Sequence, residues 1–368
     1  MKIRNGWYLA PALCLLLFSG TAAAAPKTET GVINGAEYRI DIPGNWNGGL
    51  VVYCHGYAAT PGKFEKDKPL PPTQAVFTEA GYALAQSGYS AGGWAVEEAV
   101  FDTEALRHHF TDVYGKPKET YITGHSMGGF LTMTLVEKFP SAYDAGLPLC
   151  GPLAAPEWFM ARGAFDGLVI FNYVFPGVLP APDHIPADYK GGDEVARKIQ
   201  AALESDPEKA KKLLAYSGAH SIQDFAGSLS FVAYVVKEIQ QRAGGNPFDN
   251  RGIIYQWPGD QNALNDGVKR YSADPRAAEY LRTWYQPTGR LTRPMLAIHT
   301  TYDPIVPVNI PNFYQELTTE AGSQDLFVQQ YVEHDGHCNI TPEETAQGFR
   351  ELRDWKNGGS RPPAGPAR

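Results

Sequence analysis

The segment Thr120-Tyr121-Ile122-Thr123-Gly124-His125-Ser126-Met127-Gly128-Gly129 decides the fold class of this chain. Its first residues predict a buried strand over 119–123, and the apolar run that follows predicts a helix over 127–139, which Pro140 ends. Between strand and helix, the pattern Gly-x-Ser-x-Gly places a serine on a sharp turn, and its small neighbours let the hydroxyl project. The segment therefore predicts a nucleophilic Ser126 at the edge of a sheet.

A second copy of this pattern, Gly88-Tyr89-Ser90-Ala91-Gly92, competes with the first. The strand before it is shorter, and the helix expected after it, over 96–114, is amphipathic. The following acidic residues of that helix are expected to face solvent: Glu97, Glu98, Asp102 and Glu104. An outer helix of this kind does not suit a nucleophile turn, so Ser90 is interpreted as a loop serine.

Predicted strands and helices alternate along the sequence on both sides of Ser126. Apolar runs predict strands over 36–42, 50–55, 82–86, 119–123, 145–150, 294–299 and 326–332, and helices over 74–80, 96–114, 127–139 and 342–355. This alternation indicates an α/β protein with a parallel sheet. Residues 151–290 interrupt it with helices expected over 193–216 and 229–241, and we interpret this stretch as a lid rather than a second domain.

A serine hydroxyl becomes a strong nucleophile when a histidine removes its proton and a carboxylate orients that histidine. His334 and His337 follow the last expected strand. We favour His337, because Gly336 lets the chain turn inward, and interpret His334 as a surface or supporting residue. Asp303 follows the preceding strand and is the candidate acid; the alternative is an aspartate that only opens an Asp-Pro turn.

The oxyanion formed during such a reaction needs fixed N–H donors. The amide of Met127, directly after the serine, is one candidate. The amide of Tyr57 is the other, because the strand over 50–55 continues into His55-Gly56-Tyr57, where glycine lets the chain bend back. His55 itself is interpreted as a structural residue.

These features, in this order, resemble the α/β-hydrolase superfamily, in particular secreted serine esterases and lipases with a helical lid. The resemblance covers about residues 30–150 and 291–357. It implies a mostly parallel, eight-stranded sheet with a large helical cap inserted after the sixth strand, and acyl transfer to water through an acyl-serine. The hydrolase core would span 26–150 and 291–357, the cap 151–290, and a flexible tail 358–368.

The pair His337-Cys338 is similar to secreted tannases and feruloyl esterases, in which a cysteine beside the histidine bonds to a cysteine beside the serine. Here residue 125 is His, so that half of the pattern is absent. The resemblance then implies a bridge from Cys338 to Cys150, with Cys54 as the alternative partner.

The N-terminal residues resemble a signal peptide. Lys2 and Arg4 precede an apolar stretch over 8–18 and small residues over 21–25, so we expect export and cleavage after residue 24 or 25, with no membrane span left afterwards. The net charge of −8, without a block of Lys and Arg, argues against nucleic-acid binding. Neither a metal nor an organic cofactor is predicted, because no HExxH, P-loop or GxGxxG motif occurs.

Aromatic residues gather at the start of the insertion: Trp158, Phe159, Phe165, Phe171, Tyr173 and Phe175. Either they line a substrate pocket, for which Trp158, Phe159 and Phe171 are the candidates, or they form the core of the lid. The leading hypothesis is a secreted esterase acting on a small-molecule or polymeric ester. A serine peptidase resembling the prolyl oligopeptidase group is the alternative, and a non-catalytic binding protein is the third.

Overall fold

The computed structural model describes residues 25–367 and contains one nine-stranded sheet in the order β1-β2-β4-β3-β5-β6-β7-β8-β9. The strands are β1 (Lys27–Ile33), β2 (Ala36–Ile42), β3 (Leu50–Cys54), β4 (Ala83–Ser87), β5 (Thr120–His125), β6 (Ala145–Leu149), β7 (Met295–Tyr302), β8 (Phe327–Asp335) and β9 (Gly365–Pro366). β1 pairs with β2, and β2 with β4, in antiparallel fashion; all other neighbours are parallel.

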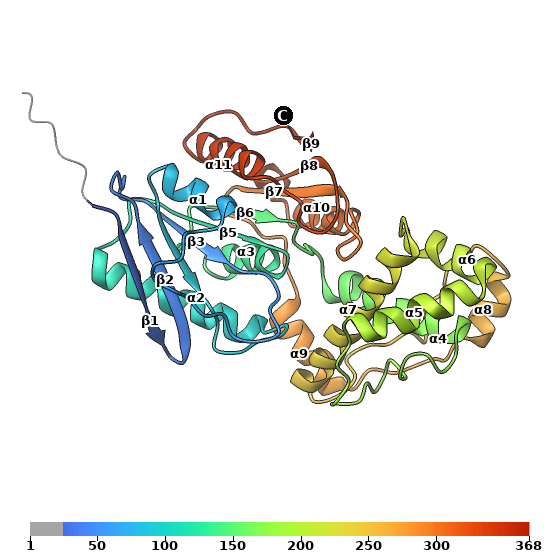
Figure 1. Cartoon of the computed structure of the whole chain (residues 1–368). Coiled ribbons are helices and arrows are strands. Elements are labelled where there is room, and N and C mark those ends of the chain that lie inside the picture. The colour runs from blue at the N-terminus through green and yellow to red at the C-terminus, as the bar shows by residue number, and fades with distance from the viewer. Residues whose placement is uncertain (1–24, 368) are drawn as a thin grey trace, which may run out of the picture.

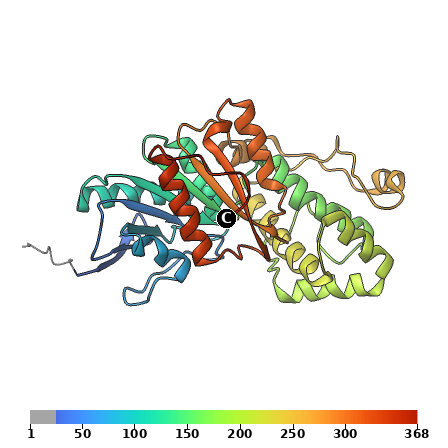
Figure 2. The same cartoon turned by 90° about the horizontal axis from the view of Figure 1, so that it is seen from above.

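Helices cover both faces of the sheet (Figures 1 and 2). One face carries α1 (Pro72–Glu79) and α11 (Pro342–Lys356), and the other carries α2 (Val96–Tyr114) and α3 (Met127–Lys138). The central strands β3 and β6 are buried at every residue, which explains their continuous apolar sequences. Because the strands from β3 to β8 run parallel, their carboxyl ends lie at the same edge of the sheet, where loops can assemble a site.

A helical insertion of about 145 residues separates β6 from β7 and lies to one side of the sheet (Figure 1). It contains the π-helix η1 (Glu157–Phe165) and the α-helices α4 (Asp166–Val174), α5 (Asp193–Ser205), α6 (Pro207–Ser217), α7 (Ile222–Ala243), α8 (Gln261–Gly267) and α9 (Pro275–Tyr285). The single helix expected over 193–216 is two helices, because Pro207 begins a new one that Asp206 caps. Between β7 and β8 lie α10 (Ile310–Glu320) and the short 3₁₀ helix η2 (Gln324–Leu326).

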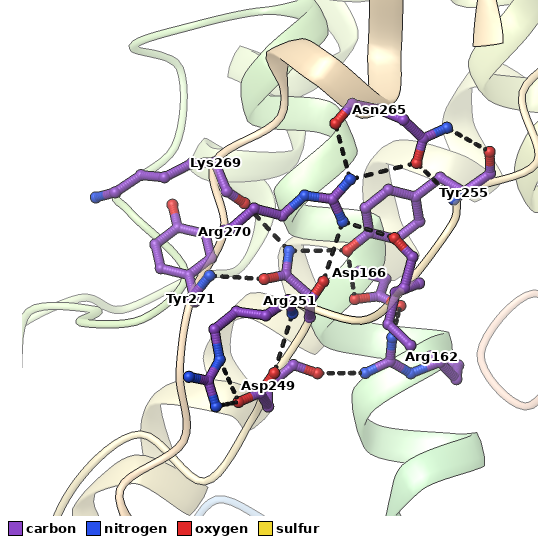
Figure 3. A network of polar contacts seen from close by, with 11 residues as sticks. Arg162, Asp166, Asp249, Arg251, Tyr255, Asn265, Lys269, Arg270 and Tyr271 are labelled. Carbon is purple, nitrogen blue, oxygen red and sulfur yellow. Dashed lines mark hydrogen bonds and ion pairs between the residues drawn. The ribbon is translucent and has the colours of Figure 1, made fainter. Parts of the chain in front are cut away.

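A buried polar network holds the insertion together (Figure 3). The Asp166 carboxylate, 2% exposed, lies 2.7 Å from Nη1 of Arg162 and accepts a 2.8 Å hydrogen bond from the Tyr255 hydroxyl. Arg270 donates to the carbonyl oxygens of Ile253 and Asn265. These bonds attach the irregular chain between α7 and α9 to η1 and α4.

Two expectations differ from the structure in detail, and a third lies mostly outside the described residues. The sheet has β1 and β9 beyond the seven strands located from the sequence, one more than the eight of the resemblance. A flexible tail is expected over 358–368, but its described residues, 358–367, lie along β8: β9 pairs with β8, and the Arg361 guanidinium donates to the carbonyl of Phe327 at 2.6 Å. The expected signal peptide lies, except for its last residue, outside the described residues. Within residues 25–367, no helix is long and apolar enough to cross a membrane.

Candidate active site

Ser126 occupies the turn between β5 and α3 in a backbone conformation that side chains rarely adopt, with φ 58° and ψ −120°. The turn depends on its glycines. A Cβ atom on Gly128 would lie 1.9 Å from the carbonyl oxygen of Cys54, and one on Gly124 would lie 2.3 Å from that same oxygen. The Ser126 amide donates a 3.0 Å hydrogen bond to Leu149, which ties the turn to the end of β6.

The structure brings the three predicted polar side chains together. Oγ of Ser126 lies 2.8 Å from Nε2 of His337, and Nδ1 of His337 lies 2.6 Å from Oδ2 of Asp303. They come from the turn after β5 and from the segments that follow β8 and β7. With Nδ1–H donating to the carboxylate, Nε2 is free to accept the serine proton. This is the geometry of a nucleophile, a base and an orienting acid.

Asp303 is buried, at 3% exposure, and remains suited to holding a positive imidazolium. Burial alone would raise the pKa of its carboxyl. The hydrogen bond and charge of His337, together with the amides of Val306 and Ile305 that donate to Oδ1, hold that pKa below its ordinary value. The Asp-Pro turn is therefore not an alternative to the acid position, because the same residue forms both.

A disulfide fixes the position of His337. Cys338 is bonded to Cys150, the residue that follows β6, and the Cys338 sulfur lies 3.5 Å from Nε2 of His337. The preceding Gly336 has φ 107° and donates its amide to Tyr302 at 2.9 Å, so the chain turns inward there. The remaining cysteine of the described residues, Cys54, is free and buried.

The other histidines near the site have different partners. His334 lies 3.0 Å from Glu344 through Nε2, away from Ser126. His125 lies 3.1 Å from the Tyr53 hydroxyl, and burial, with the nearby His337, lowers its pKa to about 4. His55 donates from Nδ1 to the carbonyl of Gly56 at 2.6 Å and stacks on Tyr89. His55 thus has the structural contacts expected of it.

The chain segments that contain the two expected oxyanion donors lie next to Ser126. Met127 is the first residue of α3, and the first amides of a helix have no carbonyl partner within it. On the other side, a Cβ atom on Gly56 would lie 3.4 Å from Cβ of Ser126, so the chain leading to Tyr57 passes directly beside Ser126. Sequence reasoning missed the residues that hold Tyr57: its hydroxyl donates to Glu238 of α7 at 3.2 Å, and its ring meets Phe231 edge-on.

Ser90, in the second copy of the motif, has another role. Its hydroxyl and amide both donate to Oδ2 of Asp102, at 2.8 and 2.7 Å. Asp102 and Glu104 are buried, so the expectation that they face solvent is wrong for both. Ser90 is therefore hydrogen-bonded to a carboxylate and not to the histidine that would activate it as a nucleophile.

A cavity of about 570 Å³ lies between the insertion and the segment after β7. Trp158 and Phe159 of η1 line it, as does Asp303, whereas Ser126 and His337 do not border it. Phe171 is fully buried inside the insertion against Phe175 and Phe225, so its assignment to the pocket is wrong. The aromatic group divides because Trp158 and Phe159 face the cavity, whereas Phe165 and Phe171 are fully buried inside the insertion. Among the described residues, no cluster of His, Cys, Asp and Glu side chains could hold a metal ion.

Comparison with solved structures places this arrangement in a known fold. A Mycobacterium tuberculosis puromycin-hydrolyzing peptidase superposes with a TM-score of 0.50 at 12% identity, covering 94% of this chain and 41% of that one. The chain has the α/β-hydrolase fold. Also similar are a Pyrococcus horikoshii acylaminoacyl peptidase (TM-score 0.46, 11% identity, 93% of this chain and 42% of that one) and a Pyrococcus furiosus esterase (TM-score 0.43, 13% identity, 90% and 88%).

The chain spans less than half the length of the two peptidases. No protein-family profile matches it. In a comparison of sequences, an o-phthalyl amidase of Xanthobacter agilis is 23% identical, over 90% of this chain and 88% of the amidase.

Proposed function

We propose that the protein is a serine hydrolase that cleaves carboxylic esters through an acyl-serine at Ser126. The observation that carries this proposal is the continuous hydrogen-bonded chain from Ser126 through His337 to Asp303. The comparisons support a hydrolase, since the similar proteins include esterases, peptidases and an amidase.

In the proposed reaction, Oγ of Ser126 attacks the carbonyl carbon while Nε2 of His337 takes the serine proton. Asp303 stabilises the resulting imidazolium. The amides of Met127 and Tyr57 hold the oxyanion. When the tetrahedral intermediate collapses, His337 gives the proton to the leaving alkoxide. Water then attacks the acyl-serine, again with His337 as base, and releases the carboxylic acid.

Amide cleavage is the second candidate activity. The same steps would release an amine instead of an alcohol, and the relative from Xanthobacter agilis is described as an o-phthalyl amidase. We also propose that the cavity beside Asp303 receives an apolar or aromatic part of the substrate, because Trp158, Phe159 and Phe225 line it.

We further propose that the protein is exported. The charged and apolar pattern of the first 25 residues and the Cys150–Cys338 bridge support this, because disulfides persist in oxidising compartments. N-terminal sequencing of secreted protein should begin at residue 25 or 26. A sequence that starts at Met1 would contradict export with cleavage.

The test of the hydrolase compares Ser126→Ala with Ser90→Ala, which alters the other copy of the motif. Hydrolysis of nitrophenyl esters, aminoacyl anilides and a phthalyl amide is measured for both variants. We expect Ser126→Ala to lose activity by a factor on the order of 10³ or more and to resist labelling by a fluorophosphonate, with Ser90→Ala labelled normally. Unchanged turnover in Ser126→Ala would refute the mechanism, and turnover confined to anilides or amides would replace the ester assignment.

A further inference from the structure

Glu238 connects the helical insertion to the loop that carries Tyr57. It lies on α7, half-buried, and its two carboxylate oxygens have different partners in the core. Oε1 accepts the hydroxyl of Tyr57 at 3.2 Å, and Oε2 accepts the backbone amide of Trp94 at 3.2 Å. A single carboxylate thereby joins the segment after β3 to the segment after β4.

The backbone beneath Glu238 is shaped to receive it. Ala58 and Gly93 form an isolated antiparallel bridge, in which the Gly93 amide donates to Ala58 at 2.7 Å. Gly93 has φ 80°, and a Cβ atom there would lie 2.7 Å from Oε1 of Glu238. The carboxylate therefore packs directly on a backbone that only glycine leaves open.

Helix α7 holds the Tyr57 side chain at two points. Phe231, two turns before Glu238, meets the Tyr57 ring at 5.1 Å with an interplanar angle of 86°, while Glu238 accepts its hydroxyl. On the other side, the Gly56 carbonyl, which shares a peptide group with the Tyr57 amide, accepts a 2.6 Å hydrogen bond from Nδ1 of His55. The orientation of the Tyr57 amide therefore depends on His55 at the peptide group and on α7 at the Tyr57 side chain.

We infer that Glu238 is a positioning residue that fixes the Tyr57 amide toward the oxyanion. The inference rests on the proposed function and deepens it, because it assigns part of the catalytic geometry to the insertion. Donors stabilise a transition state well only when they are held in place before charge develops. A Tyr57 loop released from Glu238 would reorient during the reaction, and the cost would appear in the chemical step.

A neighbouring contact of the same helix supplies a matched control. Arg242 lies one turn beyond Glu238 on α7, pairs with Glu98 at 2.7 Å and donates to the carbonyl of Gly92 at 2.8 Å. It attaches the insertion to the core without touching Tyr57. Loss of Arg242 therefore weakens the attachment of the insertion while leaving the hydrogen bond between Glu238 and the Tyr57 hydroxyl in place.

The experiment compares Glu238→Gln, Tyr57→Phe, their double variant and Arg242→Gln in the full-length protein. For each variant, kcat and KM on a nitrophenyl ester and the midpoint of thermal unfolding are measured. Glutamine keeps the shape of Glu238 but only one acceptor oxygen, and phenylalanine keeps the ring of Tyr57 without its hydroxyl. We expect kcat to fall about tenfold in each single variant, with KM within about twofold. The double variant should be little slower than the slower single variant.

The control Arg242→Gln should keep kcat within about twofold of wild type, even if its unfolding midpoint falls. Unchanged kcat in Glu238→Gln and Tyr57→Phe would overturn the inference. So would a double variant whose fold loss in kcat equals the product of the two single losses, because the two residues would then act independently. An equal loss of kcat in Arg242→Gln would overturn it as well. The proposed function has a separate test: it would be contradicted if Ser126→Ala kept its turnover. If that variant is inactive while Glu238→Gln keeps its kcat, only the positioning role is lost.

Discussion

Cys338 is bonded to Cys150, so the residue after His337 is joined to the residue after β6. The last residue of β6, Leu149, accepts the amide of Ser126. Ser126 and His337, 211 residues apart in the chain, are therefore both anchored at the end of one strand. The bridge closes a loop of 188 residues that includes the whole insertion.

The first prediction concerns this bridge. In the double variant Cys150→Ala/Cys338→Ala, we expect kcat to fall at least about tenfold, because the His337 loop is released from the strand that holds Ser126. The free energy of unfolding should fall by about 3–5 kcal/mol, since a bridge across so long a loop strongly restricts the unfolded chain. Steady-state kinetics and urea unfolding measure the two effects.

The control for the bridge is reductant. Dithiothreitol should slow the wild-type enzyme to a similar degree and leave the double variant unaffected. If the double variant keeps the wild-type kcat, the bridge has no part in placing His337, whatever happens to the unfolding free energy.

Elements with a strong local signal could be predicted from the sequence. The helix expected over 96–114 has the bounds of α2, and the helix expected over 342–355 corresponds to α11, which a Thr341–Glu344 capping box opens. The position of Ser126 followed from the small residues that its turn requires. The candidate acid and base followed from the order of strands along the chain, and the structure brings their side chains within hydrogen-bonding distance.

Features that depend on distant partners could not be predicted. Glu104 looks like a surface residue in sequence, yet Tyr143 and Arg107 satisfy its charge in a buried position. Phe171 resembles its neighbour Phe159 but faces the interior of the insertion. Glu238 carries no sequence signal at all, because its significance comes from Tyr57 and Trp94, which lie more than 140 residues away.

The second prediction concerns the close approach of α3 to β3. Gly128→Ala would place a methyl group 1.9 Å from the carbonyl oxygen of Cys54, a backbone atom that cannot move without shifting the central strand. We expect the unfolding free energy to fall by about 3 kcal/mol or more, or folded protein to be lost altogether.

Gly227→Ala is the matched control, because Gly227 lies on an exposed face of α7 and a Cβ atom there would meet nothing within 4 Å. It should stabilise the protein by about 0.5–1 kcal/mol through the higher helix propensity of alanine. Thermal and urea unfolding compare the two variants. Equal stability of Gly128→Ala and wild type would show that the strand and helix can separate at this point.

The third prediction uses the buried carboxylate of the insertion. Burial raises the pKa of Asp166 from 3.8 to about 6, although Arg162 and the Tyr255 hydroxyl favour its charged form. The folded protein therefore binds a proton at Asp166 over a pH range in which the unfolded chain has released it. The contribution of Asp166 to the free energy of unfolding therefore rises as the pH falls from about 6 to about 4. Above pH 6 the buried carboxylate is charged, and the full cost of burying that charge lowers the free energy of unfolding.

Asp166→Asn removes that titration while keeping an acceptor for Tyr255. We expect the unfolding free energy of wild type, relative to this variant, to increase by about 2–3 kcal/mol between pH 7 and pH 4. The control is Asp249→Asn: pairing with Arg251 lowers the pKa of Asp249, so its contribution should instead decline on acidification. Urea unfolding at several pH values measures all three proteins. A pH-independent difference for Asp166→Asn would mean that Asp166 stays ionised beside Arg162, and that their ion pair outweighs burial.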